Sequence, residues 1–201
     1  MQKSILKGLA LFVMAVLVGN VQAAPVLQIE NNLLTGAKFV NVDGKLYDVV
    51  FQKGSCNSVF QGCNASLFTF PTQARAANAG FALKESVFVD SVLGQFDTDP
   101  RLTNGCQFSN AFSFACHAVT PYGVTRIPGG FFAISFYNLR GVDGLFDQNL
   151  PSANLLSNYE VFAVWSESVT ETVPEPETLL LTFVALGALH LTRRKHLRSK
   201  A

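Results

Sequence analysis

The stretch AKFVNVDGKLYDVVF, residues 37–51, carries the clearest structural signal in the chain. Two runs rich in branched and aromatic residues flank Asp43 and Gly44, and glycine tolerates the positive φ angle that a two-residue hairpin turn requires. The stretch therefore predicts a β-hairpin with one strand on each side of this turn. The residues expected on its core face are Phe39, Leu46 and Val50.

Downstream of the hairpin, residues 71–93 predict one long helix. Thr72 can cap its first turn, alanines fill its middle, and Gly94 ends it. Its expected buried face consists of Ala74, Ala77, Phe81, Phe88 and Val92. Because these positions roughly follow helical spacing, the helix is expected to pack against the sheet.

Two later segments are rich in aromatic and branched residues and predict buried strands, residues 131–137 and 159–165. Residues 138–158 between them are polar and contain glycine, so they are expected to form a long connection. Since strands outnumber the single helix, the predicted fold class is α+β, with a mostly antiparallel sheet and one long helix.

The N-terminal segment, residues 1–23, has the organisation of an export signal. Two lysines precede a run of about 12 apolar residues, and small residues stand at the −3 and −1 positions of a cleavage site between Ala23 and Ala24. A membrane anchor is the alternative, but about 12 apolar residues are fewer than the ~20 that span a bilayer. The sequence therefore predicts that residues 24–172, the body, fold outside the cytoplasm.

The C-terminal segment, residues 173–201, combines three features in a fixed order. The first is a rigid, extended box made of Val173, Pro174, Glu175 and Pro176. The second is an apolar run over 179–191, about 13 residues or ~20 Å of helix, against a hydrocarbon core of ~30 Å. The third is a basic cluster that marks the cytoplasmic side of a membrane-held helix. This cluster consists of Arg193, Arg194 and Lys195.

This ending resembles the PEP-CTERM sorting signal in the order and spacing of its box, apolar run and basic cluster. The same tail has also been catalogued as an ice-binding-protein C-terminal motif. The body is similar to those of PEP-CTERM proteins without a known activity. Two residues of the tail, Glu177 and His190, depart from the usual pattern. An ordinary single-pass anchor is the alternative.

The resemblance implies how the protein is handled after export. An exosortase-type membrane transpeptidase is the expected partner, and the inner membrane is expected to hold the protein transiently. The cell surface or the extracellular matrix is then the expected destination. Because the resemblance is carried by the tail, it implies no activity for the body.

All four cysteines lie in the body: Cys56, Cys63, Cys106 and Cys116. Four cysteines allow three pairings. The local pairing closes loops of about 8 and 11 residues, for which the loop-entropy model gives roughly 2–3 kcal/mol per disulfide. Disulfides are the prediction, because the compartment outside the cytoplasm oxidises thiols and no CxxC spacing indicates zinc.

Catalytic signatures are sparse in the body. His117 is its only histidine, which excludes a multi-histidine metal site, and no GxSxG elbow supports a Ser-His-Asp hydrolase. Two carboxylate pairs, Asp97/Asp99 and Asp143/Asp147, lie in expected loops, where solvated turn residues are the more common role. The sequence therefore predicts no catalytic residue, no metal and no cofactor.

The charge and the aromatic content of the body bound its function. In the body, acidic residues outnumber basic ones, and the basic residues form no continuous stripe. This excludes nucleic-acid binding. The many phenylalanines are expected to form the core, with an exposed aromatic face for carbohydrate or a hydrophobic partner as the alternative. The predicted function is a non-enzymatic structural or binding role, and the resemblance of the tail to the PEP-CTERM signal implies that this role lies at the cell surface or in the matrix and is linked to exopolysaccharide. The alternative is an exported hydrolase that uses paired carboxylates.

Overall fold

The computed structural model describes a large part of the body. The described residues are 24–106, 115–126, 130–140, 142–151, 156 and 158–169. The predicted signal peptide, residues 1–23, and the predicted sorting segment, residues 173–201, lie outside them. The compact unit that contains the described elements ends at Ser168. Within the described residues, no helix has the length and apolar character needed to cross a membrane.

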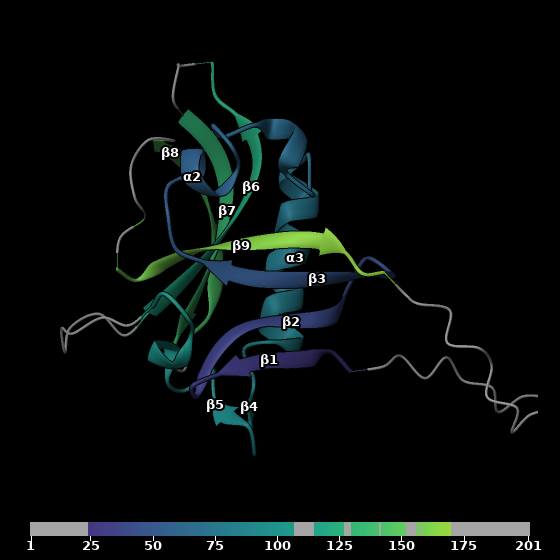
Figure 1. Ribbon diagram of the computed structural model, residues 1–201, viewed down its shortest axis with the longest axis vertical. Coiled ribbons are helices and arrows are strands. Elements are labelled where there is room, and N and C mark those ends of the chain that lie inside the picture. Colours follow the sequence, from purple (N-terminus) through teal and green to yellow (C-terminus); the bar gives the residue numbers. More distant parts are fainter. Residues whose placement is uncertain are drawn as a thin grey trace, which may run out of the picture. The chain divides into compact units, whose positions relative to one another are not determined.

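Most of the structure is one sheet of seven strands in the order β1-β2-β3-β9-β6-β7-β8 (Figure 1). Its strands are β1 (Val26–Glu30), β2 (Leu33–Val42), β3 (Lys45–Gln52), β6 (Ala115–Val124), β7 (Gly130–Leu139), β8 (Gly144–Pro151) and β9 (Glu160–Glu167). Neighbouring strands are antiparallel except β6 and β9, which are parallel. The sheet therefore consists of two antiparallel meanders, β1-β2-β3 and β6-β7-β8, joined through the last strand.

The predicted hairpin is present, but it buries the opposite face. Asp43 and Gly44 have φ angles of 54° and 82° and connect β2 to β3. The expected core face of Phe39, Leu46 and Val50 is wrong, because Val50 is 54% exposed. Side chains alternate along a strand, and the face with more aromatic area is buried. The buried residues of β3 are Tyr47, Val49 and Phe51.

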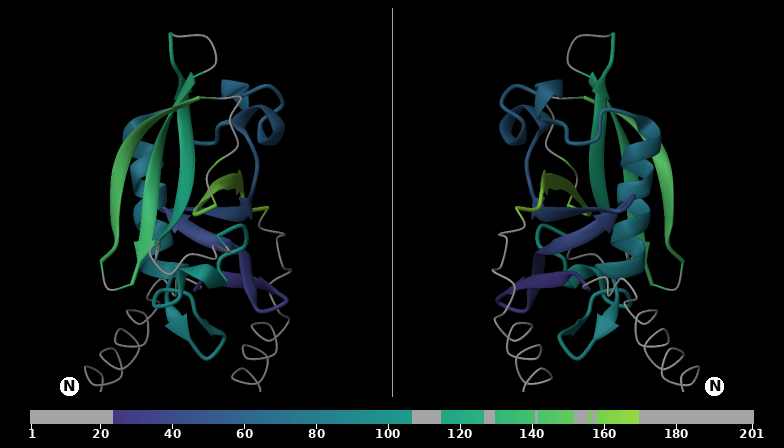
Figure 2. Two further views of the ribbon diagram at one scale, coloured as in Figure 1. Left: turned by 90° about the vertical axis from the view of Figure 1, so that its left-hand side faces the viewer. Right: turned by 90° about the vertical axis from the view of Figure 1, so that its right-hand side faces the viewer.

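One face of the sheet is covered by the helix α3 (Gln73–Ser86), which packs against β2, β6 and β7 (Figure 2). Thr72 caps this helix, as predicted, and its side chain accepts a hydrogen bond from the backbone N–H of Arg75 at 3.4 Å. At Gly80 an added Cβ would lie 2.3 Å from Leu145 Cδ2, so a larger residue here would require the Leu145 side chain to move. The buried residues of the helix are Ala76, Ala79, Gly80, Ala82 and Leu83.

The helix is shorter than predicted and buries a different face. It ends at Ser86, and the Val-Phe-Val run at 87–89 that follows is rich in β-branched residues, which disfavour helix. Phe81, expected in the core, is 50% exposed. Short elements occupy the surrounding loops: η1 (Ala65–Leu67), β4 (Asp90–Ser91), β5 (Gly94–Gln95) and η2 (Pro100–Leu102).

Apolar clusters lie on both faces of the sheet. The cluster beneath α3 contains the aromatic side chains of Tyr47, Phe51, Phe70, Phe88, Phe96, Phe136 and Trp165. The cluster on the other face includes residues of the short helix α2 (Cys56–Val59). Its aromatic side chains are Phe60, Phe68, Phe131 and Phe162. These rings confirm the prediction that phenylalanines form the core.

The predicted α+β class is wrong. In the part of the chain that the structure describes, the fold is mostly β, and α3 is its one long helix, packed on a mixed sheet. The sequence-based assignment missed β1, β6 and β8. The register of β6 shifts between Pro121 and Gly123, at a bulge where proline is tolerated. β8 is an edge strand, and its exposed polar residues resemble those of a loop.

Candidate functional site

The four cysteines form two disulfides in the local pairing. The Cα atoms of Cys56 and Cys63 are 4.9 Å apart, and those of Cys106 and Cys116 are 5.6 Å apart. The first bond links α2 to the loop that follows it, and the second links the segment after η2 to β6. All four cysteines are buried and none is free, so they are not zinc ligands.

Four rings gather at one end of the sheet face that lies opposite α3. His117 on β6 pairs with Tyr137 on β7, and the two ring centroids are 6.2 Å apart. The ring centroids of Phe146 on β8 and of Tyr159, just before β9, lie 5.5 and 5.3 Å from that of His117. We call these four residues the His117 cluster. The backbone N–H of His117 donates to the carbonyl of Tyr159 at 2.7 Å, which holds the cluster together.

Burial of the His117 imidazole favours its neutral form. Burial lowers its pKa below the ordinary value of 6.5, and the nearby carboxylate of Glu160 only opposes this shift. The Nδ1 atom is buried and has no hydrogen-bond partner. A buried N–H without an acceptor is rarer than an unpaired acceptor, so we assign the proton to Nε2. The ring can therefore donate one hydrogen bond through Nε2.

A second unpaired polar atom lies on the same face. Ser135 is fully buried, pairs with Phe146 across the β7–β8 ladder, and its Oγ has no hydrogen-bond partner. Phe146 and Tyr159 are 38% and 39% exposed. The groups exposed at this surface are therefore the rings of Phe146 and Tyr159, which suit contact with an apolar ligand face, whereas the two unpaired polar atoms are buried.

A further polar group lies on the α3 side of the sheet, around Asp147. The Tyr122 hydroxyl donates to Asp147 Oδ1 at 2.9 Å, and Gln73 Nε2 donates to Asp147 Oδ2 at 2.9 Å. Burial, and then Asp147, raise the pKa of Tyr122 to about 12, so the phenol stays protonated. The ring of Tyr122 stacks on that of Phe132 at 5.9 Å. Asp147 is therefore occupied by neutral donors.

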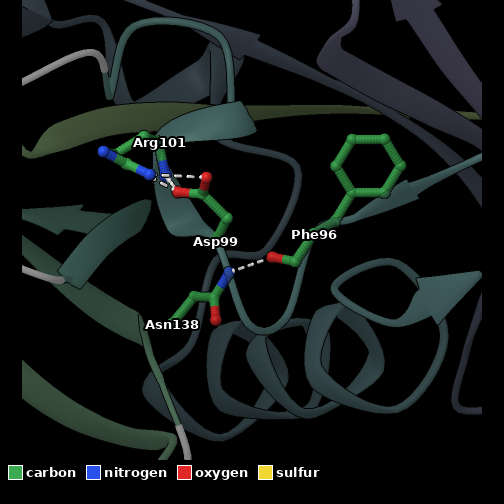
Figure 3. Close-up of polar contacts among 4 residues, drawn as sticks. All are labelled: Phe96, Asp99, Arg101 and Asn138. Atoms are coloured by element: carbon green, nitrogen blue, oxygen red, sulfur yellow. Dashed lines mark hydrogen bonds and ion pairs between the residues drawn. The ribbon is translucent and has the colours of Figure 1, made fainter.

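The expected carboxylate pairs are rearranged in the structure. Asp99 accepts from Arg101 Nε at 2.7 Å, and this hydrogen bond lowers the pKa of Asp99 (Figure 3). Asp143 accepts from the backbone N–H of Leu139 at 3.1 Å and has different partners from Asp147. Burial raises the pKa of Asp97, and the carboxylates of Asp143 and Asp90 raise it further. Among the described residues, no three or more histidine, cysteine, aspartate or glutamate side chains form a cluster that could hold a metal ion.

A buried amide side chain holds the loop that carries Asp97 and Asp99 against the sheet. The side chain of Asn138 on β7 is fully buried, and its Nδ2 donates to the Phe96 carbonyl at 2.6 Å (Figure 3). Phe96 is itself fully buried. The segment that carries Asp97 and Asp99 is therefore fixed against β7, and the two carboxylates extend from an anchored loop.

A cavity of about 10 Å³ lies between β6 and β9, enough for one water and too small for a substrate. Beside it, Trp165 Nε1 donates to Thr120 Oγ1 at 3.2 Å. The cavity is lined by Phe60, Phe68, Thr69, Phe70, Thr120, Pro121, Ala163 and Trp165. A cavity of this size is a small gap in core packing and not a ligand site.

Several predicted site residues fall outside the described residues, namely Ala23, the sorting box Val173, Pro174, Glu175 and Pro176, and the basic cluster Arg193, Arg194 and Lys195. Ala24 is the first described residue and is exposed. Comparison with protein-family models, curated proteins and solved structures finds no match to this chain. The geometry above therefore carries the functional argument for the body.

Sequence reasoning noted His117 only as the single histidine of the body, without assigning it to a site, and missed the rings around it. Tyr137 and Tyr159 stand at the ends of segments that were predicted as buried strands, but Tyr159 is 39% exposed and Tyr137 is only partly buried. Phe146 was assigned to a connection, because the polar residues within β8 are typical of a loop. Recognising residues 115–124 as a strand would have assigned His117 to a strand, but its neighbours are set by the pairing of that strand with β7 and β9.

Proposed function

We propose that this chain is an exported cell-surface or matrix protein, sorted through its C-terminal segment, with a non-enzymatic structural or binding role linked to exopolysaccharide. The observation that carries this proposal is the pair of disulfides in the body. Cys106 and Cys116 belong to the core beneath α3, so the body depends on an oxidised bond at its centre. Such bonds persist outside the cytoplasm.

The sequence of the two ends supports the same route. The segment 1–23 directs export, and the box at 173–176, the apolar run at 179–191 and the basic cluster retain the tail in the inner membrane. An exosortase-type transpeptidase then cuts near the box and releases the body to the surface. Prolines keep the box extended, which gives a protease an accessible substrate just outside the bilayer.

The His117 cluster supports a binding role for the body. Half-exposed rings of Phe146 and Tyr159 can pack on the C–H face of a sugar ring, and His117 can donate to a hydroxyl. Rings of this kind, held by strands of one sheet, are pre-organised for contact. Exopolysaccharide is therefore the candidate partner of the cluster.

The sorting proposal is tested by following a tagged full-length chain in a host with exosortase and in one without it. Fractionation and intact-mass measurement should find surface protein that lacks Arg193, Arg194 and Lys195 only in the competent host. Replacing Pro174 and Pro176 by alanine should leave uncleaved protein in the inner membrane, whereas the control Glu171→Ala should be processed normally. Surface protein that retains the basic cluster would show that the tail is only an anchor.

One observation favours a second candidate, the exported hydrolase. A carboxyl whose pKa is raised by burial and by neighbouring carboxylates can act as a general acid, and Asp97 beside Asp143 and Asp90 has this environment. Loss of a measured glycan-cleaving activity in Asp97→Asn, with retention in Asp99→Asn, would support this candidate over the binding role.

A further inference from the structure

The last strand of the chain fills a slot in the middle of the sheet. β9 pairs antiparallel with residues 47–52 of β3 and parallel with residues 117–119 of β6. In the sheet order, β9 alone joins the two meanders, as its place beside β3 in Figure 1 illustrates. Both meanders precede β9 in the chain, so the slot is synthesised before the strand that fills it.

β9 also completes the apolar clusters on both faces of the sheet. Phe162 lies on the face opposite α3, where its ring is 5.4 Å from that of Phe60 and 5.8 Å from that of Phe131. Without β9, both clusters would be open to water along the centre of the sheet. The β9 side chains that face α3 are Val161, Ala163 and Trp165, none more than 6% exposed.

Side chains of other elements fasten both ends of this strand. Lys53 Nζ donates to the carbonyl of Glu160 at 2.8 Å. At the other end, the Ser168 hydroxyl donates to Asp48 Oδ1 at 2.5 Å. The fastened strand ends there, and residues 169–172 separate it from the predicted sorting box. The closing strand and the sorting segment are therefore consecutive in the chain.

We propose that the slot between β3 and β6 is a binding site for one extended strand, filled by residues 160–167 of the same chain. The body stays open, and able to bind that strand in trans, until the C-terminal end has been delivered. The inference rests on the proposed function in one respect only: delivery of the C-terminal end is taken to mean its export from the cytoplasm. Folding of the body then follows export of nearly the whole chain, immediately before the sorting segment.

The slot selects its strand by the order of small and large side chains. Ala163 pairs with Phe51, and this small residue leaves room for the Phe51 ring to stack on Phe88 at 5.2 Å. Trp165, two residues later, instead fits beside Phe70, with ring centroids 5.5 Å apart. A strand with these two side chains exchanged would have the same composition but the wrong shape for the slot.

The test compares two deletions in the full chain, both of which keep residues 1–23 and the sorting segment. One chain lacks 158–169 and therefore β9, and the matched chain lacks 26–30 and therefore the edge strand β1. Each is purified in mild detergent and digested with protease, with and without a synthetic peptide of residues 158–169. The control peptide carries Ala163→Trp and Trp165→Ala. Trp165 is the only tryptophan of the chain, so its emission reports docking of the peptide.

The chain without β9 should be digested at least about tenfold faster than the full chain, whereas loss of β1 should have a smaller effect. The native peptide should restore resistance and shift its tryptophan emission to the blue, and the exchanged peptide should do neither. The proposal is overturned if the chain without β9 resists digestion, if loss of β1 is equally damaging, or if the native peptide fails to protect. Fractionation of the same chains reports sorting separately, so failure of the proposed function is distinguishable.

Discussion

Ser168 and Asp48 tie the end of the folded unit to its first hairpin. The Ser168 hydroxyl donates to Asp48 Oδ1 at 2.5 Å, and the same oxygen accepts from the backbone N–H of Phe39 at 3.1 Å. Phe39 has a φ angle of 60°, in a bulge of β2 between Ala37 and Val40. One carboxylate oxygen therefore supports a left-handed residue of β2 and the exit of β9.

Replacing Asp48 by alanine should lower the free energy of unfolding by about 1–3 kcal/mol, because two donors lose their acceptor. Ser168→Ala should cost less, about 0.5–1.5 kcal/mol, since it removes one hydrogen bond. Denaturant titration of the purified protein measures both. The exposed residue Glu85 on α3 gives the control, and Glu85→Ala should stay within about 0.5 kcal/mol of the parent. An Asp48→Ala protein as stable as the control would contradict this role of the carboxylate.

The two disulfides should be found in correctly exported protein. Mass mapping without reductant should link Cys56 to Cys63 and Cys106 to Cys116. Replacing Cys106 and Cys116 together by alanine should lower the free energy of unfolding by about 2–5 kcal/mol. Four free thiols in exported protein would contradict this pairing.

His117 should make the body less stable as the pH falls. Its pKa in the folded protein lies below the unfolded value of 6.5, so the unfolded state binds more protons in this range. Stability is then present above about pH 6.5 and is lost as the pH falls toward the lower folded pKa. His117→Gln should flatten the pH dependence of the denaturation midpoint between about pH 5 and 7.5, because His117 is the only histidine of the body. An unchanged slope in this variant would contradict the assignment.

Local signals predicted the parts of the fold that depend on neighbouring residues. The Asp43-Gly44 turn and the Thr72 cap could be predicted, because turns and caps depend on a few adjacent residues. The central position of β9 in the sheet could not be predicted from the sequence. Its run of branched and aromatic residues predicts a buried strand, but its partners β3 and β6 are chosen by packing across the whole chain.

The candidate site could not be predicted from the sequence for the same reason. His117, Phe146 and Tyr159 are brought together by the register of β6, β8 and β9, not by their spacing. The carboxylates show this as well, since those that raise the pKa of Asp97 are Asp143 and Asp90, and not its sequence neighbour Asp99. Pairing in sequence did not predict pairing in space.

The last prediction concerns binding by the His117 cluster. Phe146→Ala and Tyr159→Ala should each weaken binding of exopolysaccharide purified from the producing cells by about tenfold, or ~1.4 kcal/mol, because each removes one ring face from the surface. Phe81→Ala is the matched control, because Phe81 is a 50% exposed aromatic residue on α3, on the other side of the sheet. Titration calorimetry measures the affinities, and denaturant titration checks that all three variants remain folded. Equal losses in all three would indicate non-specific contact through exposed rings. Full binding by the Phe146 and Tyr159 variants would show that the cluster is a packed end of the sheet, because a true contact surface cannot lose two of its rings without losing affinity.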